Sequence, residues 1–193
     1  MGIGSRYPHV VRLLKKYARP NDRVLELGCG GAVYKDFFID RYIGIDLPAS
    51  PYAQQGDISV YCSAEALPFK SRIFDLLFIV AALYQIPEES AVLSEALRVL
   101  CMGGYLLIFD YTWRTTWRLE KSEGSKCHHW TQWQLARIVR NHGFKTYVSS
   151  EWLPEPKARW KRMLTRTRLG KFLRLVLNEI RGGWNVVVAV KKS

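Results

Sequence analysis

The stretch RVLELGCGG at residues 23–31 decides the fold, because it joins an apolar run directly to a glycine turn. Residues 23–27 have the composition of a buried strand with one acid, Glu26. Gly28 and Gly30 allow positive φ angles and let a ligand approach the main chain. Residues 33–38 are predicted to begin a helix whose N-terminal amides face that ligand. Together these features predict a strand, turn and helix that handle a nucleotide.

The next segment, YIGID at residues 42–46, predicts a second strand that ends in Asp46. A carboxylate at this point can accept hydrogen bonds from both hydroxyls of a ribose. Val33 occupies the place of the third glycine in the dinucleotide motif G-x-G-x-x-G, which argues against a dinucleotide site. Glu26 is costly to bury without a compensating partner, and a cationic ligand would be such a partner.

These residues resemble the first motif of the class I S-adenosylmethionine-dependent methyltransferases, hydrophobic-x-Glu/Asp-hydrophobic-Gly-x-Gly, which residues 24–30 match. Ala32 stands where that family usually has a third glycine. A second resemblance lies at residues 63–69, SAEALPF, which are similar to the family signature D-A-x-x-L-P-F and precede an apolar strand at residues 74–80. Ser63 replaces the acid that usually accepts a hydrogen bond from the adenine amino group.

The resemblance implies S-adenosylmethionine as cofactor and assigns residues to its parts. Gly28 and Gly30 would admit the cofactor near the backbone, and Glu26 would face its cationic end. Asp46 would bind its ribose. The remaining cofactor-binding residues would be Leu47, Ser63, Ala64 and Glu65 beside the adenine and Ile79 near the reacting methyl group. Methyl transfer from a sulfonium depends on positioning and charge, so no metal is expected.

The acceptor side of the site is less defined by sequence. His128 and His129 follow the fifth predicted strand, and a histidine there could remove a proton near neutral pH; a surface pair or a helix cap is the alternative. Tyr84, Tyr111 and Trp113 are candidates for an aromatic acceptor pocket, although aromatic residues of the predicted loop at 111–130 could equally pack on one another. Residues 82–85, ALYQ, lack the Asn/Asp-Pro-Pro-Tyr/Phe motif of enzymes that methylate exocyclic base nitrogens.

Length and alternation define the fold class. With 193 residues and 48% hydrophobic content, a single domain over residues 1–193 is expected, with a basic helical insertion at about 153–183. Alternating strands and helices predict a doubly wound α/β fold with a mostly parallel seven-stranded sheet. Residues 144–152 and 184–191 are the predicted terminal antiparallel pair. The four cysteines have no C-x-x-C spacing, so neither a zinc site nor a disulfide framework is indicated.

Charge points to an anionic partner. The formal net charge is +12, and residues 157–181 carry nine basic side chains against a single acid, Glu179. Apolar residues in this segment recur at helical spacing, which suits either a helix on an anionic membrane surface or a helix packed on its own domain. Residues 1–5 do not form a signal peptide and no apolar run spans a bilayer, so a cytoplasmic protein is expected, with peripheral membrane attachment left open.

The sequence therefore predicts an S-adenosylmethionine-dependent methyltransferase that acts on a small-molecule or lipid-like, anionic acceptor. An RNA methyltransferase is the nearest alternative, since basic residues also suit phosphates. A second alternative is an inactive binding module that keeps the cofactor fold and docks through its basic helix, because Ala32, Ser63 and the turn CMGG at residues 101–104 depart from the family pattern. The oligomeric state is not indicated.

Overall fold

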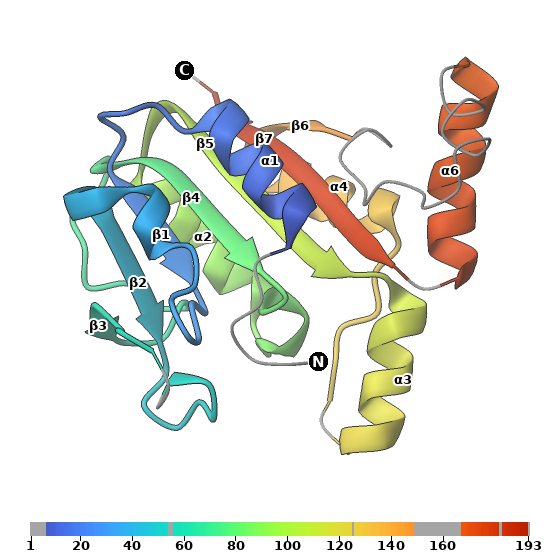
Figure 1. The fold of residues 1–193 in the computed structure, drawn as a ribbon, viewed down its shortest axis with the longest axis horizontal. Coiled ribbons are helices and arrows are strands. Elements are labelled where there is room, and N and C mark those ends of the chain that lie inside the picture. Colours follow the sequence, from blue (N-terminus) through green and yellow to red (C-terminus); the bar gives the residue numbers. More distant parts are fainter. Residues whose placement is uncertain (1–6, 54–55, 125, 149–166, 182, 193) are drawn as a thin grey trace.

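One sheet contains β3 (Val60–Tyr61), β2 (Tyr42–Asp46), β1 (Val24–Leu27), β4 (Phe74–Val80), β5 (Leu100–Tyr111), β7 (Trp184–Lys191) and β6 (Phe144–Tyr147), in that spatial order (Figure 1). The computed structural model describes residues 7–53, 56–124, 126–148, 167–181 and 183–192. The first five strands in this order, β3, β2, β1, β4 and β5, are parallel to one another. Strand β7 is antiparallel to both β5 and β6. This confirms the predicted mostly parallel seven-stranded sheet with a terminal antiparallel pair.

Helices cover both faces of the sheet (Figure 1). They are α1 (Pro8–Tyr17), α2 (Glu89–Val99), α3 (Trp113–Glu123), α4 (Gln132–Asn141) and α6 (Arg168–Arg181), with short 3-10 helices η1 (Lys35–Phe37), η2 (Ile39–Arg41) and η4 (Leu83–Gln85). The buried side of α1, including Leu13, packs with Phe78 and Phe109 on one face. On the other face, Leu93 of α2 and Val139 of α4 belong to a second apolar core.

The connection between β1 and β2 differs from the prediction of a helix beginning near residue 33. The chain passes from the glycine turn through Ala32, which has a φ of 50°, into the two short 3-10 helices η1 and η2. Phe38, with a φ of −122°, separates them. Residues 30–34 form turns and Phe38 interrupts the segment that follows, so no continuous α-helix forms before β2. The prediction for residues 33–38 is therefore wrong.

Residues 111–130 were predicted as a loop, and this is also wrong because α3 occupies Trp113–Glu123. At the start of the helix the Thr112 amide donates to the carbonyl oxygen of Gly183 at 3.0 Å, and the Thr112 hydroxyl accepts from the Gly183 amide at 2.9 Å. Gly124 ends the helix in the left-handed conformation, with a φ of 71°. Aromatic and β-branched residues have modest helix propensity, so tertiary contacts decide the conformation of this segment.

The expected basic insertion is described only in part. The helix α6 lies within it and leads directly toward β7, whereas residues 149–166 lie outside the described part of the chain. The same limit applies to the predicted extension of β6 to residue 152, since the described strand ends at Tyr147. The division of the chain into one domain with an insertion stays a prediction.

A buried polar network joins α4, α6 and β7. The side chain of Gln132 exchanges two hydrogen bonds with the backbone of Val186, at 3.0 and 2.7 Å. The amide of Gln132 donates to Glu179 of α6 at 2.6 Å. Asn185 donates to the carbonyl oxygen of Trp130 at 2.9 Å. These buried hydrogen bonds connect α4 and α6 to the sheet and satisfy polar groups that have no access to water.

Asp110, at the carboxyl end of β5, is fully buried directly opposite Asn185 of β7. The Oδ2 atom of Asp110 and the Oδ1 atom of Asn185 lack a donor among the described residues. Burial raises the pKa of Asp110 to about 8, although backbone amides of Tyr111 and Tyr84 donate to the carboxylate. A neutral Asp110 carries a proton and becomes a donor in a region that otherwise presents two unpaired acceptors.

The variant Asp110→Asn is expected to flatten the pH dependence of stability. An unfolded aspartate ionises near a pKa of about 3.9, whereas folded Asp110 retains its proton up to about pH 8. The free energy of unfolding should therefore fall as pH rises between about 4 and 8, by up to about 1.4 kcal/mol per pH unit for this group. Urea denaturation across this range measures the slope, and the exposed-site variant Asp40→Asn is the control. Equal slopes in wild type and Asp110→Asn would contradict the assignment.

Candidate functional site

The glycine turn lies at the carboxyl ends of β1 and β4, between which the order of the strands along the sheet reverses. Gly28 has a φ of 67°, and a Cβ atom added to it would lie 2.6 Å from the Cβ of Ala82. Only glycine satisfies both conditions without movement of the turn. In open α/β sheets, ligands bind at such a reversal. The turn therefore places its backbone where a ligand is expected.

A cavity of about 460 Å³ opens beside this turn. Its walls come from the glycine turn, from the ends of β4 and β5, and from α3. The lining residues are Tyr7, Glu26, Gly28, Cys29, Gly30, Gly31, Val33, Tyr34, Tyr52, Val80, Ala81, Tyr84, Gln85, Tyr111, Leu119 and Glu123. Two of these are carboxylic acids, and this lining contains no lysine, arginine or histidine. The cavity is thus suited to a cation, although the whole chain is strongly basic.

Glu26 is the buried acid of this cavity. Its Oε2 atom accepts a hydrogen bond of 2.5 Å from the Tyr42 hydroxyl, and its side chain is 2% exposed. Burial raises the pKa of Glu26 to about 8; the hydrogen bond from Tyr42 opposes this rise, and the charge of Asp46 adds to it. A cationic ligand at this position would favour the ionised form.

Sequence reasoning missed Tyr42, the partner of Glu26. The phenol can reach along β2 because Gly44 leaves space: a Cβ atom at Gly44 would lie 2.5 Å from the Tyr42 hydroxyl oxygen. The signal was an aromatic residue two positions before a glycine on the same face of a strand. Tyr42 holds the Glu26 carboxyl in one orientation.

Asp46 ties the second strand to the glycine turn. One carboxylate oxygen accepts from the amide of Gly30 at 2.7 Å, and the other accepts from the amide of Leu47 at 2.8 Å. Each carboxylate oxygen can accept more than one hydrogen bond, so both retain capacity for ligand hydroxyls. The structure thus brings Asp46 to the glycine turn, as the strand-turn-strand pattern predicted.

Ser63 and Glu65 form a local pair after β3. The hydroxyl of Ser63 donates to Glu65 at 3.0 Å, and it accepts from the Glu65 amide at 3.1 Å. Glu65 also accepts from the amide of Glu88 at 3.1 Å. Ala64 between them is buried and Leu47 is exposed. None of these four predicted adenine neighbours lines the cavity itself, so their role stays a prediction.

At the end of β4, Ile79 is fully buried in the core, and the following residues Val80 and Ala81 line the cavity instead. Ala81 has a φ of 51°, a conformation that residues other than glycine rarely adopt. Strained backbone of this kind is concentrated at functional sites. The position of Ile79 near the reacting methyl group stays a prediction.

Of the three predicted acceptor residues, Tyr84 and Tyr111 line the cavity. Their rings pack edge to face, with 5.4 Å between the ring centres. Burial is the main cause that raises the pKa of both hydroxyls, so they remain protonated and act as hydrogen-bond donors. Tyr7 and Trp184 extend this aromatic cluster behind Tyr111. Trp113 is exposed on α3 and does not line the cavity.

The two predicted histidines lie beside the cavity rather than in its lining. The Nε2 atom of His128 lies 2.9 Å from the carbonyl oxygen of Ile86. The imidazole ring stacks on Trp130, with 4.6 Å between the ring centres. The Nε2 atom of His129 lies 2.5 Å from Glu120, and its Nδ1 atom lies 2.8 Å from the Thr116 hydroxyl. Both rings are engaged by the protein; a role as base stays a prediction.

Among the lining residues that escaped the sequence-based assignment of the cavity are Tyr34, Tyr52, Cys29, Leu119 and Glu123. Tyr52 comes from the irregular segment after β2, which crosses the glycine turn: a Cβ atom at Gly56 would lie 2.4 Å from the carbonyl oxygen of Gly30. Leu119 and Glu123 belong to α3, which had been predicted as loop. Cys29 lies within the glycine motif itself, whereas no local motif marks Tyr52, Leu119 or Glu123, which the fold brings to the turn.

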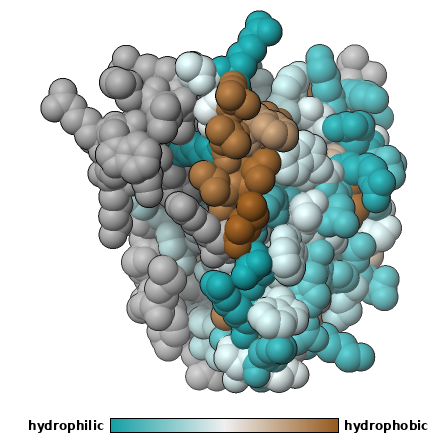
Figure 2. Space-filling view, turned by 90° about the vertical axis from the view of Figure 1, so that its right-hand side faces the viewer, coloured by the Kyte–Doolittle hydropathy of each residue, from teal (hydrophilic) through white to brown (hydrophobic). Residues whose placement is uncertain are grey.

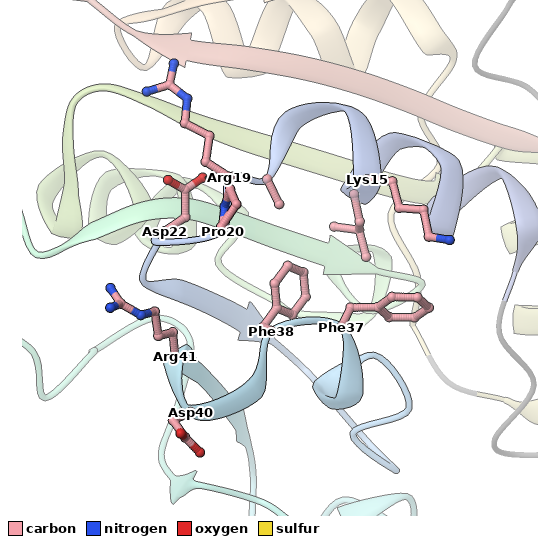
Figure 3. Close-up of a pocket in the computed structure, with 10 residues that line it drawn as sticks. Lys15, Arg19, Pro20, Asp22, Phe37, Phe38, Asp40 and Arg41 are labelled. Atoms are coloured by element: carbon pink, nitrogen blue, oxygen red, sulfur yellow. Dashed lines mark hydrogen bonds between the residues drawn. The ribbon is translucent and has the colours of Figure 1, made fainter.

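A second cavity, of about 500 Å³, lies between the C-terminal end of α1 and the short helices η1 and η2. Figure 3 shows that the charged ends of Lys15, Arg19 and Arg41 point away from one another, while Phe38 points into the space. Its residues 19–22 precede β1, at the amino end of the strand. It lacks convergent polar groups and lies away from the strand reversal, so the smaller cavity is the better candidate site.

The fold and the site define a nucleotide-binding α/β protein whose cavity suits a cationic ligand. Residues 25–108 match the family model described as a methyltransferase domain. This part of the chain is accordingly similar to the methyltransferase domain family. This confirms the resemblance that the glycine turn and the residues 63–69 indicated.

Among curated relatives, the chain is 42% identical over 111 residues to the ubiquinone/menaquinone biosynthesis C-methyltransferase UbiE of Xanthomonas axonopodis pv. citri, covering 49% of this chain and 44% of that protein. It is 37% identical over 100 residues to phthiotriol/phenolphthiotriol dimycocerosates methyltransferase 1 of Mycobacterium ulcerans, covering 46% of this chain and 37% of that protein. The chain thus spans less than half the length of these relatives.

Solved structures show the same fold at low sequence identity. Geranyl diphosphate C-methyltransferase from Streptomyces coelicolor, in complex with Mg²⁺, geranyl diphosphate and S-adenosyl-L-homocysteine, superposes with a TM-score of 0.66 and 15% identity. The match covers 95% of this chain and 78% of that one. A putative methyltransferase from Bacillus halodurans superposes with a TM-score of 0.67 and 19% identity, covering 95% and 99%.

Replacement of the histidines tests whether either one serves as a base. If one of them removes the acceptor's proton, His128→Ala or His129→Ala should lower turnover by roughly a hundredfold. Affinity for S-adenosylmethionine, measured by calorimetry, should not change, because neither residue lines the cavity. Turnover assays over a pH series provide the readout once an acceptor is in hand. Wild-type turnover in both single variants and in the double variant would leave the histidines with a structural role.

Proposed function

We propose that this protein transfers a methyl group from S-adenosylmethionine to a small-molecule or lipid-like acceptor in the cavity beside the glycine turn. One observation carries the proposal. The cavity combines the backbone of Gly28 and Gly30 with the buried acid Glu26, and it contains no basic side chain in its lining. A cationic, nucleoside-bearing cofactor suits both features.

The residues present fit the cofactor. Gly28 cannot carry a Cβ atom without displacing Ala82, which keeps the turn open to a ligand. Glu26 is held by Tyr42 and provides a carboxylate for the cationic end. Asp46 uses one acceptor position on each oxygen for the turn and retains others for ribose hydroxyls. Ser63, Ala64, Glu65 and Leu47 are the proposed neighbours of the adenine.

The bound cofactor supplies an activated methyl group on a sulfonium. The chain contributes position and electrostatics, which are the main requirements of an in-line transfer. Val80 and Ala81 border the cavity at the end of β4, and the protonated hydroxyls of Tyr84 and Tyr111 can donate hydrogen bonds to an acceptor. Glu123 at the α3 side adds a second carboxylate.

The cavity lining favours an acceptor whose reacting part is neutral and planar or apolar. Tyrosine side chains are prominent in the lining of the cavity. An anionic group inside the cavity would meet the carboxyl groups of Glu26 and Glu123. If the acceptor carries an anionic group, as predicted, that group would therefore remain outside the cavity, near basic residues on the protein surface. Relatives named as quinone-biosynthesis and dimycocerosate methyltransferases support a lipid-like acceptor.

We also propose, as the sequence suggested, that the basic segment at residues 157–181 binds an anionic membrane surface. The described part of this segment, α6, carries Arg168, Lys171 and Arg174 on the same helix as several exposed apolar residues. Each basic residue near an anionic surface contributes about 1 kcal/mol. Residues 157–166 lie outside the described part of the chain.

The variant Asp46→Ala tests the cofactor site. Charge-assisted hydrogen bonds contribute about 1.5–3 kcal/mol, so the loss of the carboxylate should weaken the binding of S-adenosylmethionine and of its demethylated product by roughly ten- to hundredfold. Isothermal titration calorimetry measures both affinities. Asp40→Ala, an exposed acid beside the other cavity, should bind as wild type does.

Unchanged affinity in a folded Asp46→Ala protein would contradict the assignment of the ribose site. A wild-type protein that binds neither S-adenosylmethionine nor its product would contradict the proposed activity as a whole. In that case the inactive binding module, which docks through its basic helix, would be the better description.

A further inference from the structure

Helix α3 has two faces with different surroundings. Leu119 and Glu123, four residues apart, line the cavity. Trp113 and Trp117, also four residues apart, are 37% and 47% exposed. Since residues four apart lie on the same side of a helix, α3 separates the cavity from the surface that carries these two tryptophans.

The exposed side of α3 pairs each tryptophan with a cation. The guanidinium of Arg114 lies 5.3 Å from the ring centre of Trp113, and the ammonium of Lys121 lies 3.9 Å from that of Trp117. Arg118 is exposed on the same helix. Amphipathic tryptophan rings beside lysine and arginine are typical of surfaces that sit at the headgroup level of a membrane.

Helix α6 continues this surface. It contacts α3, and the two helices lie together at the same side of the molecule (Figure 1). Its exposed apolar side chains recur at intervals of three and four residues: Leu169, Phe172, Leu173, Leu177 and Ile180, between 43% and 68% exposed. Figure 2 looks at this side and shows an apolar stripe with hydrophilic side chains above and below it.

Charge identifies the occupant of this surface. Arg168, Lys171 and Arg174 accompany the stripe on α6, and the chain as a whole carries a net charge of +12. An apolar stripe with basic neighbours and interfacial tryptophans matches an anionic lipid surface. Among the described residues no helix is long and apolar enough to cross a membrane. The surface is thus suited to lying on a bilayer.

We propose that the outer faces of α3 and α6 form one anionic-membrane-binding surface and that the acceptor is an amphiphile captured from that membrane past α3. This inference rests on the proposed function. The cavity, at about 460 Å³, is near the lower end of ligand sites, which span about 300–1,000 Å³. Shared with the cofactor, it has room for the reacting head of an acceptor. The apolar tail would remain in the bilayer against the stripe of α6.

The geometry gives α3 a direct part in acceptor choice. Its inner residues, Leu119 and Glu123, would meet the head group, while Trp113 and Trp117 set the depth of the helix in the headgroup layer. Anionic groups of the acceptor would lie with Arg114, Arg118 and Lys121, outside the acidic cavity. This resolves the contrast between a basic protein and a site without basic side chains in its lining.

The test uses the full chain with vesicles of phosphatidylcholine, with and without phosphatidylglycerol, at low salt. Wild type should co-sediment with the anionic vesicles only. The double variant Trp113→Ala/Trp117→Ala should bind roughly tenfold more weakly, and Arg118→Glu/Lys121→Glu should show a similar loss that does not depend on removing aromatic rings. Tyr61→Ala is the matched control, because Tyr61 is an exposed aromatic on β3 at the opposite edge of the sheet.

Methyl transfer from labelled S-adenosylmethionine to a total lipid extract completes the experiment. The tryptophan variant should lose incorporation when the extract is in anionic vesicles and keep it when the extract is dispersed in detergent, with its affinity for S-adenosylmethionine unchanged. Wild type that binds S-adenosylmethionine but ignores anionic vesicles, variants that sediment like wild type, or binding to transfer RNA in place of vesicles would each overturn the inference. Absence of S-adenosylmethionine binding by wild type would instead remove the proposed function.

Discussion

The structure depends on one close approach, that of Gly28 to Ala82. With a φ of 67° and no space for a Cβ atom, Gly28 lets the chain leave β1 directly beneath the end of β4. The turn lies where the strand order of the sheet reverses. The amide of Gly30 is then within 2.7 Å of Asp46 on the neighbouring strand. Backbone amides of the glycine turn, the Asp46 carboxylate and the end of β4 thereby meet in one place.

Electrostatics divide the molecule into two regions. The cavity gathers Glu26 and Glu123, while the excess of lysine and arginine in the chain lies elsewhere. The buried Glu26 accepts a hydrogen bond from Tyr42, and burial raises its pKa to about 8; a positive ligand beside it would favour the ionised form. A site of this kind selects for a cationic cofactor, and the basic helices are left to interact with what lies outside.

The central sheet could be predicted from sequence because its signals are local. Apolar runs that end in Gly28 or Asp46 mark parallel strands by composition alone, and both residues occupy the expected places. The helix predicted to begin in residues 33–38 does not form as an α-helix, because Phe38 divides this segment into two short 3-10 helices. α3 was missed because Trp113 and Trp117 give no helical signal on their own. Tyr42 and Glu123 were missed for another reason: only the register of β2 and the position of α3 bring them to the cavity.

The most direct measurement is hydrogen–deuterium exchange with and without S-adenosyl-L-homocysteine, since it reports which backbone amides the cofactor's product covers. The account predicts slower exchange in peptides that contain the glycine turn at residues 28–31 and the end of β2 at residues 46–47, where the Gly30 and Leu47 amides lie. Peptides from β6 should not change. Protection confined to residues 37–41, which border the larger cavity, would contradict the account.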